Sequence, residues 1–339
     1  MKISNIRISE TKKYITLSAT CQIRRVGLDE VRFTFAKEYK SFLHVDASPF
    51  AAALLLPSMK LGENLIIEGK ISKQLYKGMH EIMKTVLRWD IGLKPIKIYA
   101  KEIVPDTTKP KIVATFFSGG VDSFYTYLRH KKDKKPITHF LFVKGFDIDP
   151  HNTRVWQSSL SNVQKIAHEG NVEIIEVETN IKPLIEPVIA WEYTYGACLA
   201  SIGLCLRGGL KSIYIPSCSV TDRKFPCGSQ QGIDHHWNTE QLSFIHDGSK
   251  VSRLNKIIRG IAKSPLALKY LRVCYMNNNG QYNCGTCAKC LRTMISLYVA
   301  GVLDKTATLP HQLDLKLIAS LSIEEGHDLI FHKENLTGL

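Results

Sequence analysis

The sequence lacks the features of an exported or membrane-spanning chain. Its opening stretch, MKISNIRISETKK, contains no apolar core of the kind that a signal peptide requires. The longest apolar runs, residues 50–56 and 197–206, are too short to cross a bilayer. We therefore expect a cytoplasmic protein that has no membrane partner.

A disulfide framework is also missing. The chain has nine cysteines, an odd number, and no export signal, so that disulfide bonds are not expected to hold the fold together. Its 339 residues, with 44% hydrophobic and 22% charged residues, are enough for a sizeable core and suggest two domains or one large one.

Acidic residues are too few to balance the basic ones, and the formal net charge is +14. Such a charge suits nucleic acid or another polyanion. It equally suits a chain in which basic residues surround a nucleotide site. The only dense cluster, in a predicted loop, contains Lys131, Lys132, Lys134 and Lys135. Charge alone leaves both interpretations open.

The common phosphate-binding motif G-x-x-x-x-G-K-[ST] is absent. Residues 112–130, IVATFFSGGVDSFYTYLRH, instead predict a buried strand, a sharp turn through Ser118, Gly119 and Gly120, and a helix that begins near Val121. Backbone amides of such a turn form a partly positive nest for phosphate oxygens. Ser118 and Ser123 are expected to add hydroxyl donors, and Asp122 to hold Mg²⁺.

The segment SGGVDS resembles the PP-loop signature of the ATP pyrophosphatases, the adenine nucleotide alpha hydrolase-like superfamily. The resemblance implies an ATP site that grips the β- and γ-phosphates while a substrate oxygen attacks the α-phosphorus. The residues that it assigns to ATP are Ser118, Gly119, Gly120, Val121, Asp122 and Ser123.

The order of predicted elements indicates an α/β fold with a doubly wound parallel sheet of the PP-loop type. We expect an accessory α+β domain at residues 1–104, a linker at 105–110 and an ATP-binding catalytic domain at 111–339. The accessory domain is expected to serve a partner (protein or nucleic acid), a substrate or homodimerisation. Strands are expected at residues 3–8, 14–23, 31–35, 64–68, 95–100, 112–117, 138–143, 172–177 and 212–216, with a turn at 27–29. Helices are expected at 47–56, 71–89, 155–168 and 191–206, with a further helix carrying residues 256–258.

Three further segments are candidates for the site. Gly145 and Phe146 follow a predicted strand, where ligands of open α/β sheets bind. Arg253 and Lys256 share a face of a predicted helix and are expected to reach a phosphate. The polar region 221–246 is interpreted as a loop that lines the substrate pocket, although a solvated insertion explains it as well. Its polar residues include Asp222, Arg223, Ser229, Asp234, His235, His236, Trp237 and His246.

Four cysteines lie close together in residues 272–292, RVCYMNNNGQYNCGTCAKCLR. Two residues separate each of the last three, and Gly285 permits a tight turn between two of them, so the thiolates can converge on one ion. Four thiolates around Zn²⁺ make a closed structural site, and an iron–sulfur cluster uses the same ligands. The predicted ligands are Cys274, Cys284, Cys287 and Cys290.

Together with SGGVDS, this cysteine pattern resembles the 7-cyano-7-deazaguanine synthases, the QueC family, over about residues 111–301. The resemblance implies that a carboxylate on a 7-deazaguanine is adenylated and that ammonia then displaces AMP. It matches Lys256 to a phosphate-facing lysine. The chain departs from the family in the hundred residues before the loop and in region 221–246, which lacks the family's tyrosine-proline-aspartate-cysteine-arginine run. We therefore expect a QueC-like paralogue with an altered acceptor.

Three hypotheses follow. The first is an ATP-dependent C–N ligase in which Asp122, Ser123, Arg253 and Lys256 act on the phosphates and the substrate is a small carboxylate with ammonia or an amine. The second is a PP-loop tRNA-modifying enzyme of the thiolase type. The third is a nucleotide-binding module without turnover. The cofactors expected for the first are ATP, Mg²⁺ and Zn²⁺.

Overall fold

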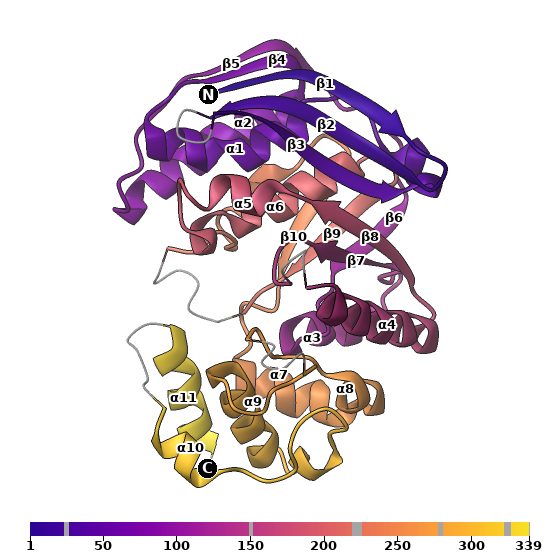
Figure 1. Ribbon diagram of the computed structural model, residues 1–339, viewed down its shortest axis with the longest axis vertical. Coiled ribbons are helices and arrows are strands. Elements are labelled where there is room, and N and C mark those ends of the chain that lie inside the picture. Colours follow the sequence, from indigo (N-terminus) through magenta and orange to yellow (C-terminus); the bar gives the residue numbers. More distant parts are fainter. Residues whose placement is uncertain (24–26, 149–151, 219–225, 277–280, 322–326, 339) are drawn as a thin grey trace.

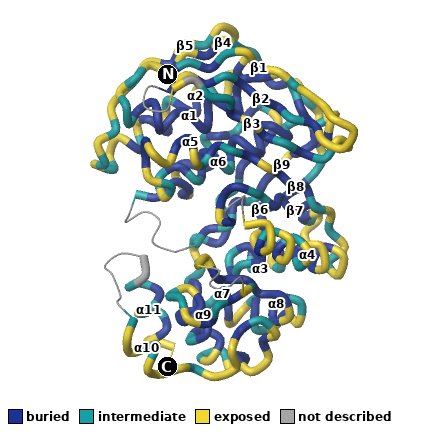
Figure 2. The backbone as a smooth tube through the Cα atoms, in the orientation of Figure 1, coloured by how far each residue is buried: buried dark blue, intermediate teal, exposed yellow. Residues whose placement is uncertain are grey.

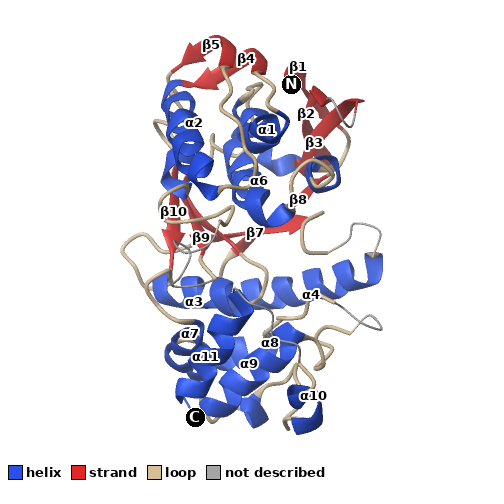
Figure 3. Cartoon of the chain, turned by 90° about the vertical axis from the view of Figure 1, so that its left-hand side faces the viewer, coloured by secondary structure: helices blue, strands red, loops and turns tan. Residues whose placement is uncertain are grey.

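One ten-stranded sheet runs through the protein, with helices on both faces (Figure 1, Figure 3). The computed structural model describes residues 1–23, 27–148, 152–218, 226–276, 281–321 and 327–338. The strand order is β10-β9-β6-β7-β8-β3-β2-β1-β4-β5. The prediction of an α/β fold with a large, mostly parallel sheet is confirmed.

Five parallel strands form the half of the sheet that carries the predicted ATP loop. The central strand is β6; the chain adds β7 and β8 on one side of it and then β9 and β10 on the other. This reversal makes the sheet doubly wound, and ligands of such sheets bind at the reversal point. The strands are β6 (Ile112–Phe116), β7 (His139–Lys144), β8 (Glu173–Thr179), β9 (Leu210–Pro216) and β10 (Ser243–Asp247).

The connecting helices cover the two faces of this half. Helices α3 (Val121–His130) and α4 (Thr153–Gly170) lie on one face, and α6 (Trp191–Cys205), preceded by the short α5 (Ile181–Ile185), lies on the other (Figure 3). Asn152 caps α4 by accepting a hydrogen bond from the backbone of Val155. Most of α6 is buried, which matches its nearly continuous apolar sequence.

The first hundred residues continue the same sheet. Strand β3 pairs antiparallel with β8, with Phe33 opposite Thr179. Helix α1 (Ser48–Leu61) packs against α6, and residues of both belong to one hydrophobic core with the strands (Figure 2). The division at residues 105–110 stays a prediction. The elements before it are β1 (Lys2–Glu10), β2 (Tyr14–Ile23), β3 (Gly27–Ala36), α1, β4 (Leu65–Ser72), α2 (Lys73–Val86) and β5 (Ile98–Val104).

A second hydrophobic cluster lies on the α3/α4 face and is completed by the C-terminal helices (Figure 1). The helices that contribute to this cluster are α7 (Arg253–Arg259), α8 (Pro265–Tyr270) and α9 (Ala288–Val299); α10 (Leu315–Ala319) and α11 (His327–Gly338) follow them in the chain. Short 3-10 turns are η1 (Lys37–Phe42), η2 (Leu87–Trp89), η3 (Asp234–Trp237), η4 (Ile261–Lys263) and η6 (Leu303–Lys305).

Three local predictions were wrong. Residues 27–29 belong to β3, not to a turn, because each of them pairs with β2. Ile71 belongs to strand β4, which ends at Ser72, and the helix begins at Lys73 with the Ser72 side chain as its cap. Part of the polar region 221–246 forms β10, which pairs with β9. None of the helices in the described ranges combines the length and apolarity that crossing a membrane requires.

Candidate functional site

A cavity of about 790 Å³ opens at the C-terminal ends of β6, β7 and β9. Its volume falls in the ~300–1,000 Å³ range of small-molecule sites. It lies where the strand order reverses, which is where nucleotides bind in doubly wound sheets. The cavity contains most of the predicted ATP loop.

Two sides of the cavity differ in origin. We call the side formed by lining residues within segments 116–123, 141–148 and 215–218 the strand wall. We call the opposing set of C-terminal residues the helix wall; its members are Arg253, Arg272, Val273, Cys274, Tyr275, Lys289, Arg292 and Phe331.

The glycine loop in the strand wall is tied to the helix wall. Gly119 has a φ of +76°, a left-handed conformation that favours glycine. Its carbonyl oxygen accepts a hydrogen bond of 2.8 Å from the backbone N–H of Arg272. Gly120 has an ordinary φ of −83° and serves as the N-cap of α3. Of the two glycines, only Gly119 therefore adopts a backbone conformation that favours glycine.

The two serines of the loop differ in exposure. Ser118 is exposed and lines the cavity. Ser123 is buried, and its hydroxyl donates a hydrogen bond of 3.0 Å to the carbonyl oxygen of Gly120. Ser123 thus stabilises the first turn of α3, while Ser118 is the serine placed to donate to a ligand.

Of the two candidate residues after β7, Gly145 and Phe146, only Phe146 lines the cavity. Phe146 lines the cavity, and its ring contacts that of Trp191 at 4.8 Å between centroids. Gly145 is not among the described residues that line the cavity. It has a φ of +104°, and a Cβ atom there would lie 2.2 Å from the carbonyl oxygen of Thr179. Close packing on β8 therefore accounts for this glycine.

Asp122 lies between two cations at the base of the site. Its Oδ2 accepts a hydrogen bond of 2.6 Å from Arg253, and its Oδ1 accepts one of 2.9 Å from Lys256. Lys256 is 1% exposed and also donates to the carbonyl oxygen of Ser217. Burial raises the pKa of Asp122, but Lys256 and Arg253 outweigh it and hold this pKa below its usual value. The structure thus joins three predicted site residues from two distant segments.

Arg253 retains a donor for a ligand. The residue is 8% exposed and lines the cavity, and in the described part of the chain its Nε has no hydrogen-bond partner. A buried guanidinium with an unsatisfied N–H is costly unless a ligand supplies the acceptor. An anionic ligand fits this donor.

The remaining cations of the helix wall were missed by the sequence analysis. Arg272 precedes the first predicted cysteine ligand, and Lys289 and Arg292 lie on α9 with Cys290 between them. Their placement beside the cysteines was visible in the sequence. Nothing in their spacing, however, showed that this segment folds over the glycine loop. The helix wall therefore presents three arginines and a lysine to one cavity.

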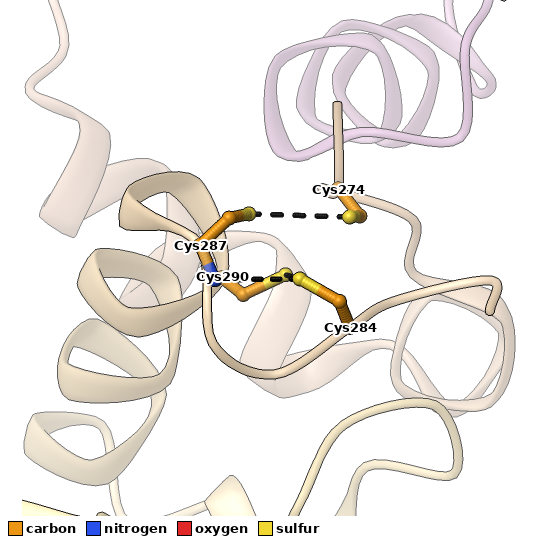
Figure 4. Close-up of side chains that lie close together, drawn as sticks. All are labelled: Cys274, Cys284, Cys287 and Cys290. Carbon is orange, nitrogen blue, oxygen red and sulfur yellow. Dashed lines mark hydrogen bonds between the residues drawn. The ribbon is translucent and has the colours of Figure 1, made fainter. Parts of the chain in front are cut away.

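The cysteine cluster adjoins the helix wall, to which Cys274 belongs. The four sulfur atoms lie within 4.8 Å of one another, and their side chains point toward a common centre (Figure 4). The Sγ–Sγ distances are 3.9 Å for Cys274 and Cys287 and 3.9 Å for Cys284 and Cys290. Zn–S bonds of about 2.3 Å in a tetrahedron place sulfurs about 3.8 Å apart, so this arrangement can hold Zn²⁺.

Local structure favours the thiolate form of Cys287. Cys287 is the N-cap residue of α9, and its backbone N–H donates a hydrogen bond to the sulfur of Cys284. A hydrogen bond from the Cys290 thiol lowers the pKa of Cys287 to about 4. Gly285 has a φ of +72°, and a Cβ atom there would lie 2.8 Å from Pro310. The glycine expected to permit the turn is thus required both by φ and by space.

The polar residues of region 226–246 mostly pair among themselves. Nδ1 of His246 lies 2.8 Å from Oδ2 of the fully buried Asp234, which also accepts from Ser229. The ring centroids of His235 and His236 lie 3.9 Å apart in η3. Within this region only Pro226 and Cys227 line the cavity. Asp222 and Arg223 lie outside the described residues.

No family model matches this chain, and neither a curated protein nor a solved structure resembles it closely enough to count as a match.

Proposed function

We propose that this protein is a QueC-like, ATP-dependent C–N ligase. It adenylates a carboxylate or carbonyl oxygen of a small substrate and transfers the activated group to ammonia or an amine. The observation that carries the proposal is the position of SGGVDS. The segment turns from β6 into α3 at the reversal point of the sheet and lines one cavity together with Arg253, Arg272 and Arg292. If the five parallel strands are numbered along the chain from β6, their order across the sheet is 3-2-1-4-5, as in doubly wound nucleotide-binding folds.

The cavity suits a triphosphate. Amides of the loop and of the first turn of α3 supply donors along the strand wall, and guanidinium groups face them from the helix wall. Binding the β- and γ-phosphates between these sets exposes the α-phosphorus to a substrate oxygen. The oxygen attacks, the bond from the α-phosphorus to the β-phosphate oxygen breaks, and pyrophosphate leaves.

Amide formation completes the reaction. The amine nitrogen attacks the acyl carbon, loses a proton to solvent, and displaces AMP, which carries away one oxygen of the substrate. Cations that bind the phosphates stabilise the charge that develops on both leaving groups. Mg²⁺ would supply further neutralisation of the phosphates. Asp122 already engages Arg253 and Lys256 with its two oxygens, and Asp147 is the other carboxylate of the strand wall.

The rest of the cavity suits a planar substrate. Aromatic side chains line it beyond the loop, and a 7-deazaguanine derivative can stack on such surfaces. The lining aromatic residues outside the loop and the helix wall are Phe116, Phe117, Phe142, Phe146, Trp191, Tyr193 and Tyr195.

The thiolase alternative receives one supporting observation and one opposing it. Cys218 and Cys227 both line the cavity, as a sulfur-transferring enzyme requires. Burial raises the pKa of Cys218 to about 12, however, so this thiol is not ionised at neutral pH and is a poor nucleophile. A ligase needs no cysteine nucleophile, and the cavity therefore favours the first hypothesis.

Product analysis by mass spectrometry tests the proposal. The protein is incubated with ATP, Mg²⁺ and ammonia, with and without 7-carboxy-7-deazaguanine labelled with ¹⁸O in its carboxylate. We expect AMP and pyrophosphate only with the acid, and one ¹⁸O atom in the AMP. ADP as product, or unlabelled AMP, would contradict adenylation of the acid. Turnover that appears only with RNA would favour the tRNA-modifying alternative.

A further inference from the structure

Helix α11 has no role in the hypotheses drawn from the sequence, yet it lies against the two helices that carry the cations of the site. It packs on α7 and on α9 (Figure 1, Figure 3). Helix α7 carries Arg253 and Lys256, and α9 carries Lys289 and Arg292. The position of α11 therefore bears directly on the helix wall.

Specific contacts fix α11 to both neighbours. Asn335, 3% exposed, accepts a hydrogen bond of 2.6 Å from Ser296 and donates one of 3.0 Å to the carbonyl oxygen of Arg292. Glu334 accepts a hydrogen bond from the backbone N–H of Leu254 on α7. At Gly338 a Cβ atom would lie 2.7 Å from Leu254 and 2.9 Å from Val299. Helix α11 is thus closely seated between α7 and α9.

Phe331 is the residue of α11 that reaches the cavity. It is 5% exposed and lines the cavity. The guanidinium carbon of Arg292 lies 4.3 Å from the centroid of its ring, and that of Arg253 lies 5.6 Å away. Both distances fall within the range of cation–π attraction, which strengthens where the cation is removed from water.

We propose that Phe331 is a positioning residue for the pyrophosphate portion of ATP, an inference that rests on the proposed function. Its ring holds the guanidinium groups of Arg253 and Arg292 in place, and both arginines line the cavity. Two arginines held in this way meet phosphate oxygens without first losing side-chain freedom. The C-terminal helix is accordingly part of the nucleotide site.

Variants at Phe331 distinguish the effect of the aromatic ring on binding from the effect of its apolar volume. Leucine keeps an apolar side chain without the π-face, and tyrosine keeps the ring. Binding of Mg²⁺–ATP, pyrophosphate and AMP is measured by isothermal titration calorimetry, with thermal unfolding recorded for each protein. Leu336→Ala, at a side chain on α11 that is 70% exposed, is the control for a change in the helix itself.

We expect Phe331→Leu to weaken the binding of pyrophosphate and ATP by about tenfold, since two cation–π contacts are lost. AMP should bind as in the wild type, Phe331→Tyr should restore affinity to within about threefold, and Leu336→Ala should change nothing. Should the leucine variant fail to fold, Phe331→Met replaces it.

Equal weakening of AMP and pyrophosphate would show a general structural role and overturn the inference, as would unchanged pyrophosphate affinity in Phe331→Leu. Both results leave the proposed function intact. A wild-type protein that binds neither ATP nor pyrophosphate would overturn the proposed function and this inference together.

Discussion

The strand wall and the helix wall meet in one cavity but are built in different ways. The strand wall consists of the C-terminal ends of β6, β7 and β9 and the short segments that follow them, and it offers backbone amides and one exposed serine. The helix wall gathers side chains from α7, α9, α11 and the 272–275 segment. A local motif is enough to identify the first wall, whereas the second exists only when several helices pack together.

Disrupting the cysteine cluster, which shares Cys274 with the helix wall, is expected to have the largest effect. Replacing Cys287 by serine removes one of four thiolates from a site of a kind that contributes about 10–16 kcal/mol of apparent binding free energy in zinc-finger peptides. Elemental analysis should find about one zinc per chain in the wild type and almost none in the variant. Thermal unfolding should shift down with the loss of metal.

Cys198→Ala is the matched control, because Cys198 is fully buried in α6 and lies outside the cluster. The Cys198→Ala protein should therefore bind as much zinc as the wild type. Zinc retained by Cys287→Ser would contradict the ligand set, and stoichiometric iron in the wild type would contradict zinc.

Asp122 joins the two walls, so Asp122→Asn tests whether the helix wall depends on the strand wall. The change leaves Arg253 and Lys256, 9% and 1% exposed, without their anion. We expect a loss of about 3–5 kcal/mol in the free energy of unfolding, measured by urea titration. Formation of AMP should fall by about 100-fold or more.

The control is a similar group on the surface, in which one carboxylate contacts two lysines. Glu10 contacts Lys37 and Lys40, and all three side chains are exposed. Glu10→Gln should leave stability and AMP formation unchanged. If Asp122→Asn behaves like Glu10→Gln, the buried carboxylate does not organise the site.

Gly145 tests the packing of the strand wall. In Gly145→Ala the new methyl group meets the carbonyl oxygen of Thr179, and the left-handed φ adds strain. Gly27→Ala has a similar φ, +100°, with no atom within 4 Å of the new Cβ. We expect Gly145→Ala to be less stable than Gly27→Ala by about 1–3 kcal/mol in urea unfolding. Equal stabilities would contradict the close packing on β8.

His130 gives the smallest effect and tests how α3 is fixed to β10. The hydrogen bond to Asp247, helped by Asp133, raises the pKa of His130 above its ordinary 6.5 although burial opposes this. The stabilisation is therefore complete below pH 6.5 and is lost as the pH rises through the folded-state pKa. Urea midpoints between about pH 5.5 and 8.5 should show this decline in the wild type and a flatter profile in His130→Asn. Parallel profiles would exclude a role for this pair.

The sequence predicted the parts of the fold that depend on local pattern. Strands β6 and β7 are nearly continuous buried runs, and β8 and β9 alternate buried residues with more exposed ones; local composition reveals both patterns. Strand β10 lies in a polar stretch, Ser243–Asp247, and is a strand because β9 offers it an edge. Pairing of this kind depends on residues distant in sequence and leaves little local signal.

The sequence by itself determined two parts of the candidate site. They are the glycine loop at residues 118–123 and the convergence of four cysteines within residues 274–290. Both follow from residue type and spacing, because a nest needs glycine and a tetrahedral ion needs thiolates within reach. Tertiary structure alone decided that Asp122 lies between Arg253 and Lys256 and that Phe331 lies beside two arginines. These contacts join residues more than a hundred positions apart or on separate helices, and only the packing of the C-terminal helices brings them together.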